Sequence, residues 1–277
     1  MPTVPWDESK TANPGRIEQV WFAGVHSNVG DGYPRQGMSL VTLDWIMTKA
    51  EEPPHNLRFV LAERLMYRSH ADVDDKMYDS RRGFGVFYLW KPRNIQRLCD
   101  MNGITPNVHR SVFERIARST EGYAPGSILA DPVVVSISQT ATVTDDIRSI
   151  VRKHHGGGGP LLEREAIAQG IGRWSYRLFV YSVVVTVLAT LKEIVASQFA
   201  GDATLWEIVA GVVGTLASWK SVTFVFQTLC QYPWLIFWFL FALGSGLAVD
   251  QRLDRSYSHF WHADYIRLEL RKRMGLG

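Results

Sequence analysis

The chain has 277 residues but little cysteine. Its two cysteines, Cys99 and Cys230, are far apart in the sequence, so no disulfide framework is expected. No zinc-type spacing of cysteine and histidine occurs, and we expect neither a metal nor a cofactor. The net charge is only +3, and no basic run is interleaved with aromatic residues. Nucleic acid is therefore not an expected partner.

Two further features are missing. The first ten residues contain no apolar run, so they do not form a secretory signal peptide, and the N-terminal region is expected to stay in the cytoplasm. The nucleophile turn of serine hydrolases, usually G-x-S-x-G, is also missing. Gly37-Met-Ser39 continues without the second glycine, and Gly244-Ser-Gly246 lies in an apolar run. A complete catalytic triad cannot be assembled from this sequence.

Charge is distributed unevenly along the chain. Overall, 21% of residues are charged, as in a soluble protein. Between Leu178 and Val249, however, the charged residues are only Lys192, Glu193, Asp202, Glu207 and Lys220. A transmembrane helix needs about 20 mainly apolar residues. We therefore predict two spans, 174–193 and 222–249, with Pro233 either kinking the second or marking its start.

A shorter apolar segment, 208–218, lies between these runs. It could be a third span, an interfacial helix or a re-entrant piece. Basic residues gather outside the two runs and are rare between them, and basic flanks favour the cytoplasm. An even number of spans follows, so we prefer two, with the middle segment on the far side. The predicted location is the bacterial inner membrane, with the soluble region facing the cytoplasm.

The soluble region begins with a predicted strand at 17–23, a glycine-rich loop and a helix at 38–52 with Ser39 as N-cap. Short helices are predicted at 56–67 and 108–118, and 132–137 is either a strand or an extended lead-in to the linker. The glycine run 156–159 predicts a flexible hinge. The basic tail is predicted to be helical, and it either lies on the membrane surface or is solvated.

His26 is the main candidate for chemistry. It follows the predicted strand and lies in the glycine-rich loop. Histidine can move a proton near neutral pH, which suits a general base. The alternative is a loop histidine that only forms hydrogen bonds with its neighbours.

Other motifs fit known sites poorly. The loop glycines match neither the dinucleotide fingerprint nor the Walker pattern. An acidic cluster lacks the glycine and terminal glutamate of a calcium loop, and we interpret it as a solvated turn. The remaining histidines near the hinge and beyond the last span are assigned to the linker or the surface. The residues concerned are Gly24, Gly30 and Gly32; Asp72, Asp74 and Asp75; and His154, His155, His259 and His262.

The stretch IEQVWFAGVHSNVGDGYP, residues 17–34, resembles a hallmark segment of an α/β-hydrolase family related to the phospholipase effectors of type VI secretion systems. MSLVTLDWIMTKA looks like the helix after that loop. DSRRGFGVFYLWKPR, VHRSVFERI and EGYAP are similar to later blocks of the same family, in the same order. The resemblance covers residues 1–130, and some members also have a membrane-spanning tail.

The resemblance implies that His26 matches the triad histidine of the family. Asn28 stands where the family has aspartate, and Asp31 stands where it has glycine. The implied fold class is α/β, a partial α/β-hydrolase with the last strand, the histidine loop and the following helices, plus a C-terminal α-helical transmembrane hairpin. The expected parts are 1–150 (hydrolase-like), 151–173 (glycine-rich linker), 174–250 (transmembrane) and 251–277 (basic amphipathic tail).

The implied function is that of a membrane-anchored C-terminal portion of a lipase- or esterase-like hydrolase. It would supply His26 while an upstream polypeptide supplies the nucleophile. Its expected partners are the lipid bilayer and a lipid or ester substrate. The alternative is a catalytically inactive, membrane-anchored remnant or binding module. A transporter has less support, because the runs contain no intramembrane acidic pair.

Overall fold

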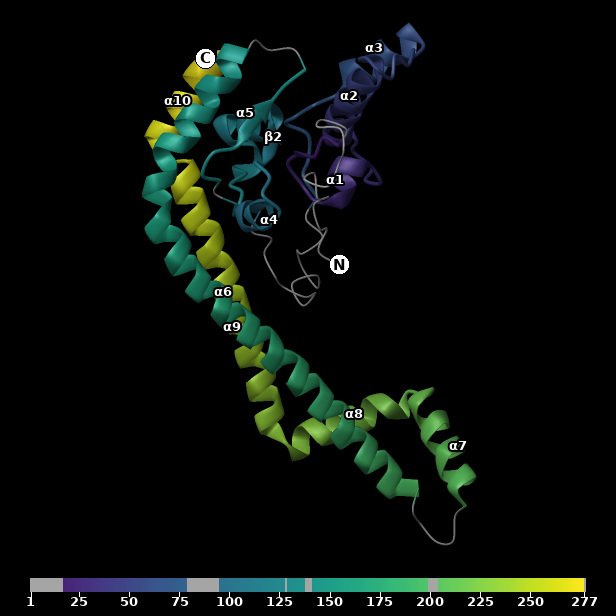
Figure 1. Cartoon of the computed structure of the whole chain (residues 1–277). Helices are drawn as coiled ribbons and strands as arrows, with labels where there is room; N and C mark the ends of the chain where they lie inside the picture. Colours follow the sequence, from purple (N-terminus) through teal and green to yellow (C-terminus); the bar gives the residue numbers. More distant parts are fainter. Residues whose placement is uncertain (1–16, 79–94, 128, 138–140, 199–203, 277) are drawn as a thin grey trace. The chain divides into compact units, whose positions relative to one another are not determined.

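The structure is a computed structural model that describes residues 17–78, 95–127, 129–137, 141–198 and 204–276 (Figure 1). The chain divides into two compact units. The first unit comprises the described parts of 1–85, 92–166 and 252–277, and the second comprises mainly 167–251.

A small parallel sheet forms part of the first unit. It contains β1 (Val20–Trp21), β2 (Asn107–His109) and β3 (Val133–Val135) in the order β1-β2-β3. Val20 lies opposite Asn107, and Val108 lies opposite Val134. The strand predicted at 17–23 and the strand alternative for 132–137 are present in shorter form. A third strand, β2, was not predicted, because it occupies residues that the sequence assigned partly to a helix.

Most described residues are helical, so the α/β class rests on this small sheet, and the likeness to a hydrolase sheet stays a prediction. β2 was missed because a three-residue strand with one apolar residue gives almost no alternating pattern. The helices of the first unit before the long C-terminal helices are α1 (His26–Gly30), α2 (Gly37–Glu51), α3 (Leu61–His70), α4 (Ile95–Met101), α5 (Arg110–Arg118) and the 3₁₀ turn η3 (Thr120–Gly122).

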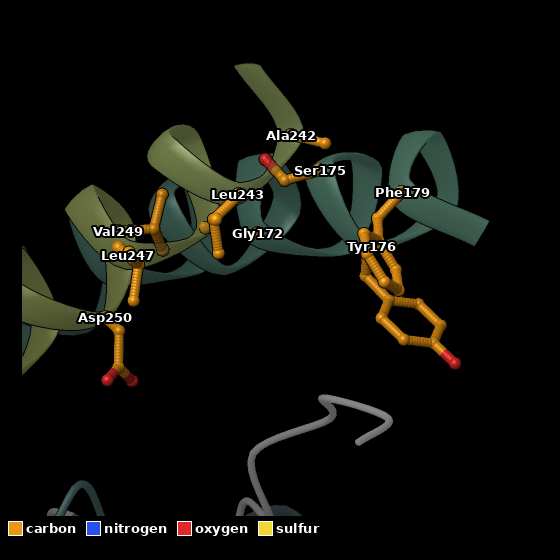
Figure 2. A pocket seen from close by; sticks show the side chains of 10 residues that line it. Gly172, Ser175, Tyr176, Phe179, Ala242, Leu243, Leu247, Val249 and Asp250 are labelled. Atoms are coloured by element: carbon orange, nitrogen blue, oxygen red, sulfur yellow. The ribbon is translucent and has the colours of Figure 1, made fainter. Parts of the chain in front are cut away.

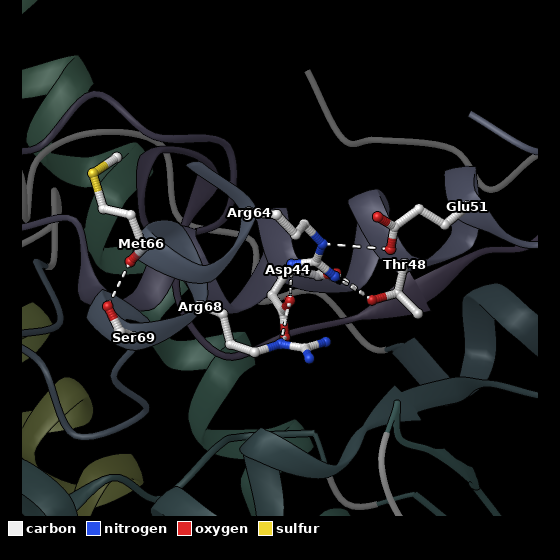
Figure 3. Close-up of polar contacts among 7 residues, drawn as sticks. All are labelled: Asp44, Thr48, Glu51, Arg64, Met66, Arg68 and Ser69. Carbon is white, nitrogen blue, oxygen red and sulfur yellow. Dashed lines mark hydrogen bonds and ion pairs between the residues drawn. The ribbon is translucent and has the colours of Figure 1, made fainter. Parts of the chain in front are cut away.

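Helix α2 confirms the helix predicted after the glycine-rich loop, but its predicted cap is wrong. The N-cap is Gln36, and Ser39 lies inside the first turn, where its hydroxyl donates a hydrogen bond to the Gln36 carbonyl at 2.9 Å. Helix α3 is fixed to α2 by a buried arginine (Figure 3). The Arg64 guanidinium pairs with Asp44 and donates to Thr48 Oγ1 at 2.6 Å. Arg64 is buried, so this pair and its hydrogen bonds set the position of α3.

The basic tail forms α10 (Asp264–Met274), which packs on α5. Its residues Ile266, Leu270 and Met274 recur every four positions and are buried. This apolar stripe is used in packing within the first unit, while Tyr265 and Leu268 are exposed, so the membrane-surface and the solvated alternatives for the tail both stay predictions. Sequence periodicity detects such a stripe but does not say which surface covers it.

The glycine run 156–159 lies inside α6 (Ala141–Gln198) rather than in a break. The predicted hinge is therefore helical. Segments with good helix formers lie on both sides of the run, and helix formation is cooperative once a turn exists. The four glycines still cost about 1 kcal/mol each relative to alanine, so this is the weakest part of α6. The domain boundaries inferred from the sequence stay predictions.

The second unit contains two helices long and apolar enough to cross a membrane, Gly170–Ser197 within α6 and α9 (Pro233–Trp261). This supports membrane association. The inner membrane and the cytoplasmic orientation stay predictions. Pro233 marks the start of α9, one of the two alternatives that the sequence left open, because proline is favoured in the first turn of a helix. Between the two long helices lie α7 (Leu205–Leu216) and α8 (Lys220–Gln231).

Helices α6 and α9 run side by side (Figure 1). Ser245 Oγ donates a hydrogen bond to Ser175 Oγ at 2.9 Å, which joins the two helices. Small residues let helices approach closely in a membrane, where hydrogen bonds between serines add to the packing. Beside this contact lies a mainly apolar groove, lined among others by Tyr176, Phe179 and Leu243 (Figure 2).

Candidate functional site

His26 lies just beyond the carboxyl end of β1. The strand ends at Trp21, and His26 is the first residue of α1, with its side chain exposed. Parallel strands end at the same edge of a sheet, so the residues that follow β1 and β2 are brought together there. The Phe22 ring stacks on the His109 ring with centroids 4.6 Å apart, which joins the two strand ends.

The entry into the His26 loop depends on Gly24. Its φ is +105°, and a Cβ at this position would lie 2.5 Å from the Asn28 Cβ. Asn28 is buried, and its Oδ1 accepts a hydrogen bond from the Val25 N–H at 3.0 Å. Glycine is thus required both for backbone conformation and for close approach. In this structure Asn28 acts as a cap that holds the loop.

The residue that follows α1, Asp31, has a backbone conformation that is unusual for aspartate. Asp31 has φ 72° and ψ 167°, a conformation that glycine adopts far more readily than any other residue. Its carboxylate accepts hydrogen bonds from the Gly32 N–H at 2.7 Å and from Gln36 Nε2 at 3.2 Å. The family that residues 17–34 resemble has glycine at this position. The backbone therefore keeps a glycine conformation that an aspartate occupies under strain.

We expect Asp31→Gly to stabilise the first unit by about 1 kcal/mol, because a non-glycine residue in this region costs on the order of 1–3 kcal/mol and the lost hydrogen bonds are exposed. Thermal unfolding of the full chain in detergent measures the effect. Asn56→Gly is the control: Asn56 has φ 50°, in the left-handed region that asparagine tolerates, so its change should be near zero. A lower midpoint for Asp31→Gly would mean that the two hydrogen bonds outweigh the strain.

The far end of the loop is fixed by Asp75. Its Oδ2 accepts a hydrogen bond from the Gly37 N–H at 2.8 Å, and its Oδ1 pairs with Arg35 Nε at 2.7 Å. A Cβ on Gly37 would lie 2.7 Å from the Asp75 Cβ, so the glycine permits this approach. A carboxylate at a helix N-terminus is stabilised by the first free N–H groups. Asp75 thereby positions the start of α2, which follows the His26 loop.

Arg115 holds the segment that carries Asp75. Its guanidinium, fully buried, donates through Nη1 to the Val73 and Asp75 carbonyls, both at 2.7 Å. Through Nη2 it pairs with Glu121 Oε2 at 2.7 Å, and the same Glu121 oxygen accepts from the Met77 N–H at 2.8 Å. The contacts lead from α5 through the 73–77 segment to the His26 loop.

The acidic cluster is therefore part of this framework. Asp74 pairs with Arg118 and accepts a hydrogen bond from Thr120, and Asp75 is buried. The interpretation as a solvated turn is wrong for Asp75, because its buried carboxylate accepts a hydrogen bond from the Gly37 N–H and pairs with the Arg35 guanidinium. Among the described residues, no group of three histidine, cysteine, aspartate or glutamate side chains is placed to hold a metal ion.

His109 is a residue that the sequence reasoning missed. It is the N-cap of α5, where Nδ1 accepts a hydrogen bond from the Ser111 N–H at 3.3 Å and lies 2.9 Å from Ser111 Oγ. Burial lowers the pKa of His109 from 6.5 to about 4, and the nearby Arg110 charge acts in the same direction while Asp44 opposes it. The ring is thus neutral at pH 7. The sequence did contain a signal for this cap, because a histidine directly precedes the predicted helix and a serine follows two positions later.

The other histidines take part in packing or lie on the surface. His154 Nε2 lies 3.2 Å from Glu269 Oε2, and His262 Nε2 lies 3.2 Å from the Tyr123 carbonyl. His259 is exposed, and the side chain of His155 is outside the described set.

Chemically, the site offers an exposed imidazole on a loop that is hydrogen-bonded at both ends. Within the described part of the chain, no carboxylate forms a hydrogen bond with the His26 ring. His26 can accept or deliver a proton there, and any nucleophile acting with it has to approach from the exposed side.

One segment of the chain matches a known family. Residues 3–49 match the family model described as "T6SS, Phospholipase effector Tle1-like, catalytic domain". This range contains β1, the His26 loop and nearly all of α2. Searches of curated proteins and of solved structures find no match. The comparisons therefore support a relation of this N-terminal segment to the type VI secretion phospholipase effectors.

Proposed function

We propose that this chain contributes the histidine-bearing part of a phospholipase- or esterase-like hydrolase site and holds it at a membrane. The observation that carries the proposal is the match over residues 3–49, which includes the exposed His26 loop. Two helices able to cross a bilayer would keep the loop close to lipid. A phospholipid ester is accordingly the proposed substrate.

The proposed role of His26 is general base. A serine hydroxyl on a second polypeptide attacks the ester carbonyl and transfers its proton to the His26 ring. The ring then delivers this proton to the leaving alcohol, and water releases the acyl group by the reverse sequence. His26 is exposed, so its ring is open to a nucleophile presented from outside the described residues.

The test uses the full chain reconstituted in phospholipid vesicles with a fluorogenic phospholipid. It is assayed alone and together with the nucleophile-bearing portion of a member of the matched family, ending before the strand equivalent to β1. We expect turnover only in the mixture, and a loss of at least about 100-fold with His26→Gln, as is typical for removal of a general base.

His262→Gln is the matched control, because that histidine belongs to packing and should leave turnover within about twofold. If the mixture stays inactive while both proteins bind each other, or if His26→Gln retains full turnover, the catalytic role is wrong. The chain would then act as a membrane-anchored binding module, the alternative favoured by the missing partner of His26 among the described residues.

A further inference from the structure

Helices α7 and α8 form a bent pair between the two long apolar helices. Each has 12 residues, and their axes differ by 89°. A helix of this length is about 18 Å long, whereas the hydrocarbon core of a bilayer is about 30 Å thick. Two such helices at a right angle reach only about 25 Å from end to end. Together the two helices are long and apolar enough for one broken span. Neither helix alone is long enough, and the bend keeps the pair from crossing in a straight line.

Charged residues are placed at both ends of α7. Glu207 lies in its first turn, where its carboxylate accepts a hydrogen bond from the Thr204 N–H at 2.8 Å. Lys220 is the first residue of α8, just beyond the bend. The 13 positions between these charges correspond to about 20 Å along a helix. An upright α7 would bury one of them deeply, at a cost of about 2.5–3.5 kcal/mol. An α7 parallel to the membrane surface buries neither.

Tryptophans lie beside these two points and at the start of α9. Trp206 stands beside Glu207, Trp219 stands at the bend, and Trp234 opens α9. Their exposed fractions are 79%, 88% and 50%. Tryptophan is enriched at the membrane–water interface. Three tryptophans at the start of α7, at the bend and after α8 indicate that each of these points lies at a membrane interface.

Each helix also has an exposed apolar face. In α7 it is formed by Val209, Val213 and Leu216, and in α8 by Val222, Val225 and Phe226. The spacings of three and four residues place each set on one side of its helix. The other side of α8 is polar, whereas α7 is apolar on nearly all sides, with Glu207 and Thr215 as its only polar residues. A helix with an apolar surface that is too short for a full span binds at the boundary between headgroups and acyl chains, about 5–10 Å deep.

We propose that α7 and α8 lie flat in one membrane interface as an L-shaped bracket, with their apolar faces in the acyl region and Lys220 at the headgroups. The bracket joins the two long helices without crossing. The chain then has two spans, and its N-terminal and C-terminal parts lie on the same side. Of the three alternatives for the middle segment, this selects the interfacial one and rejects a third span and a re-entrant loop.

The test measures the depth of single spin labels in the full chain in vesicles, with oxygen and a water-soluble nickel complex as relaxing agents. Labels are placed at Val213, Lys220 and Phe226 in a background that lacks Cys230. Leu240 in α9, which is 57% exposed, serves as the control for the bilayer interior. We expect the first three depths to agree within about 5 Å and to stay shallow, and the control to be deepest.

The alternatives give different profiles. In a re-entrant loop, the label at Lys220 would be the deepest of the three. In a span, the labels at Val213 and Phe226 would lie on opposite sides of the bilayer centre. Either result overturns the proposal. A second measurement uses Gln227→Cys on the polar side of α8, labelled with an impermeant maleimide in intact spheroplasts. Labelling without permeabilisation is expected, and labelling only after permeabilisation would place the bracket on the opposite side and contradict the cytoplasmic orientation of both ends.

Discussion

Arg115→Met should lower the free energy of unfolding of the first unit by about 3–5 kcal/mol, the range for a buried charge whose partners are left behind. The guanidinium is fully buried, and two backbone carbonyls depend on it. Hydrogen bonds to charged groups contribute about 1.5–3 kcal/mol each. Glu121 is 44% exposed, so its ion pair adds little. The buried Nε has no partner among the described residues, and losing it offsets part of the cost.

The matched control for Arg115 is Arg118→Met in the same helix. Arg118 pairs with Asp74, and both side chains are partly exposed, at 40% and 32%. Its replacement should cost less than about 1 kcal/mol, as is usual for a surface pair. Chemical denaturation of the full chain in detergent, followed by near-UV circular dichroism, measures both. Equal effects of the two variants would show that the buried carbonyl contacts do not fix the 73–77 segment.

The unfolding free energy of the first unit should also depend on pH through His109. Its pKa is about 4 in the folded chain and 6.5 when unfolded. Above pH 6.5 both states are neutral, and the full stability is present. As the pH falls from 6.5 to 4, the unfolded chain binds a proton that the folded chain excludes, so stability falls by up to about 3 kcal/mol. Below pH 4 this loss is complete and does not grow further.

His109→Asn isolates this effect, because asparagine is a good N-cap but does not titrate. Thermal midpoints of the wild type and the variant, measured between pH 7.5 and 4.5, should diverge as the pH falls, with the wild type losing more. His26→Asn serves as the control for an exposed histidine and should follow the wild type. Parallel curves for wild type and His109→Asn would mean that the buried ring is not responsible for the pH dependence.

Arg115 and His109 both belong to the framework that holds the His26 loop. Arg115 holds the segment that carries Asp75, and Asp75 fixes the start of α2 at the end of the His26 loop. His109 contacts Phe22, just before that loop begins. Replacing either residue should therefore disturb the loop and lower the stability of the unit. Neither residue takes a direct part in the proposed proton transfer.

The sequence by itself determined the local features. The two apolar runs, the helix after the glycine-rich loop and the unusual loop around His26 depend on run length, periodicity and glycine content, all of which are written in neighbouring residues. The start of α9 at Pro233 belongs to the same class, since proline restricts its own backbone. The family resemblance likewise came from one continuous stretch.

Tertiary structure alone decided the long-range features. The two carbonyl groups that Arg115 binds lie about 40 positions away in the chain, and the apolar stripe of α10 is covered by α5, more than 140 positions earlier. A periodic pattern predicts that one face of a helix will be buried, but it does not identify the element that covers this face. Burial of His109 and Asp75 follows from packing of this kind, because desolvation depends on neighbours that sequence spacing does not specify.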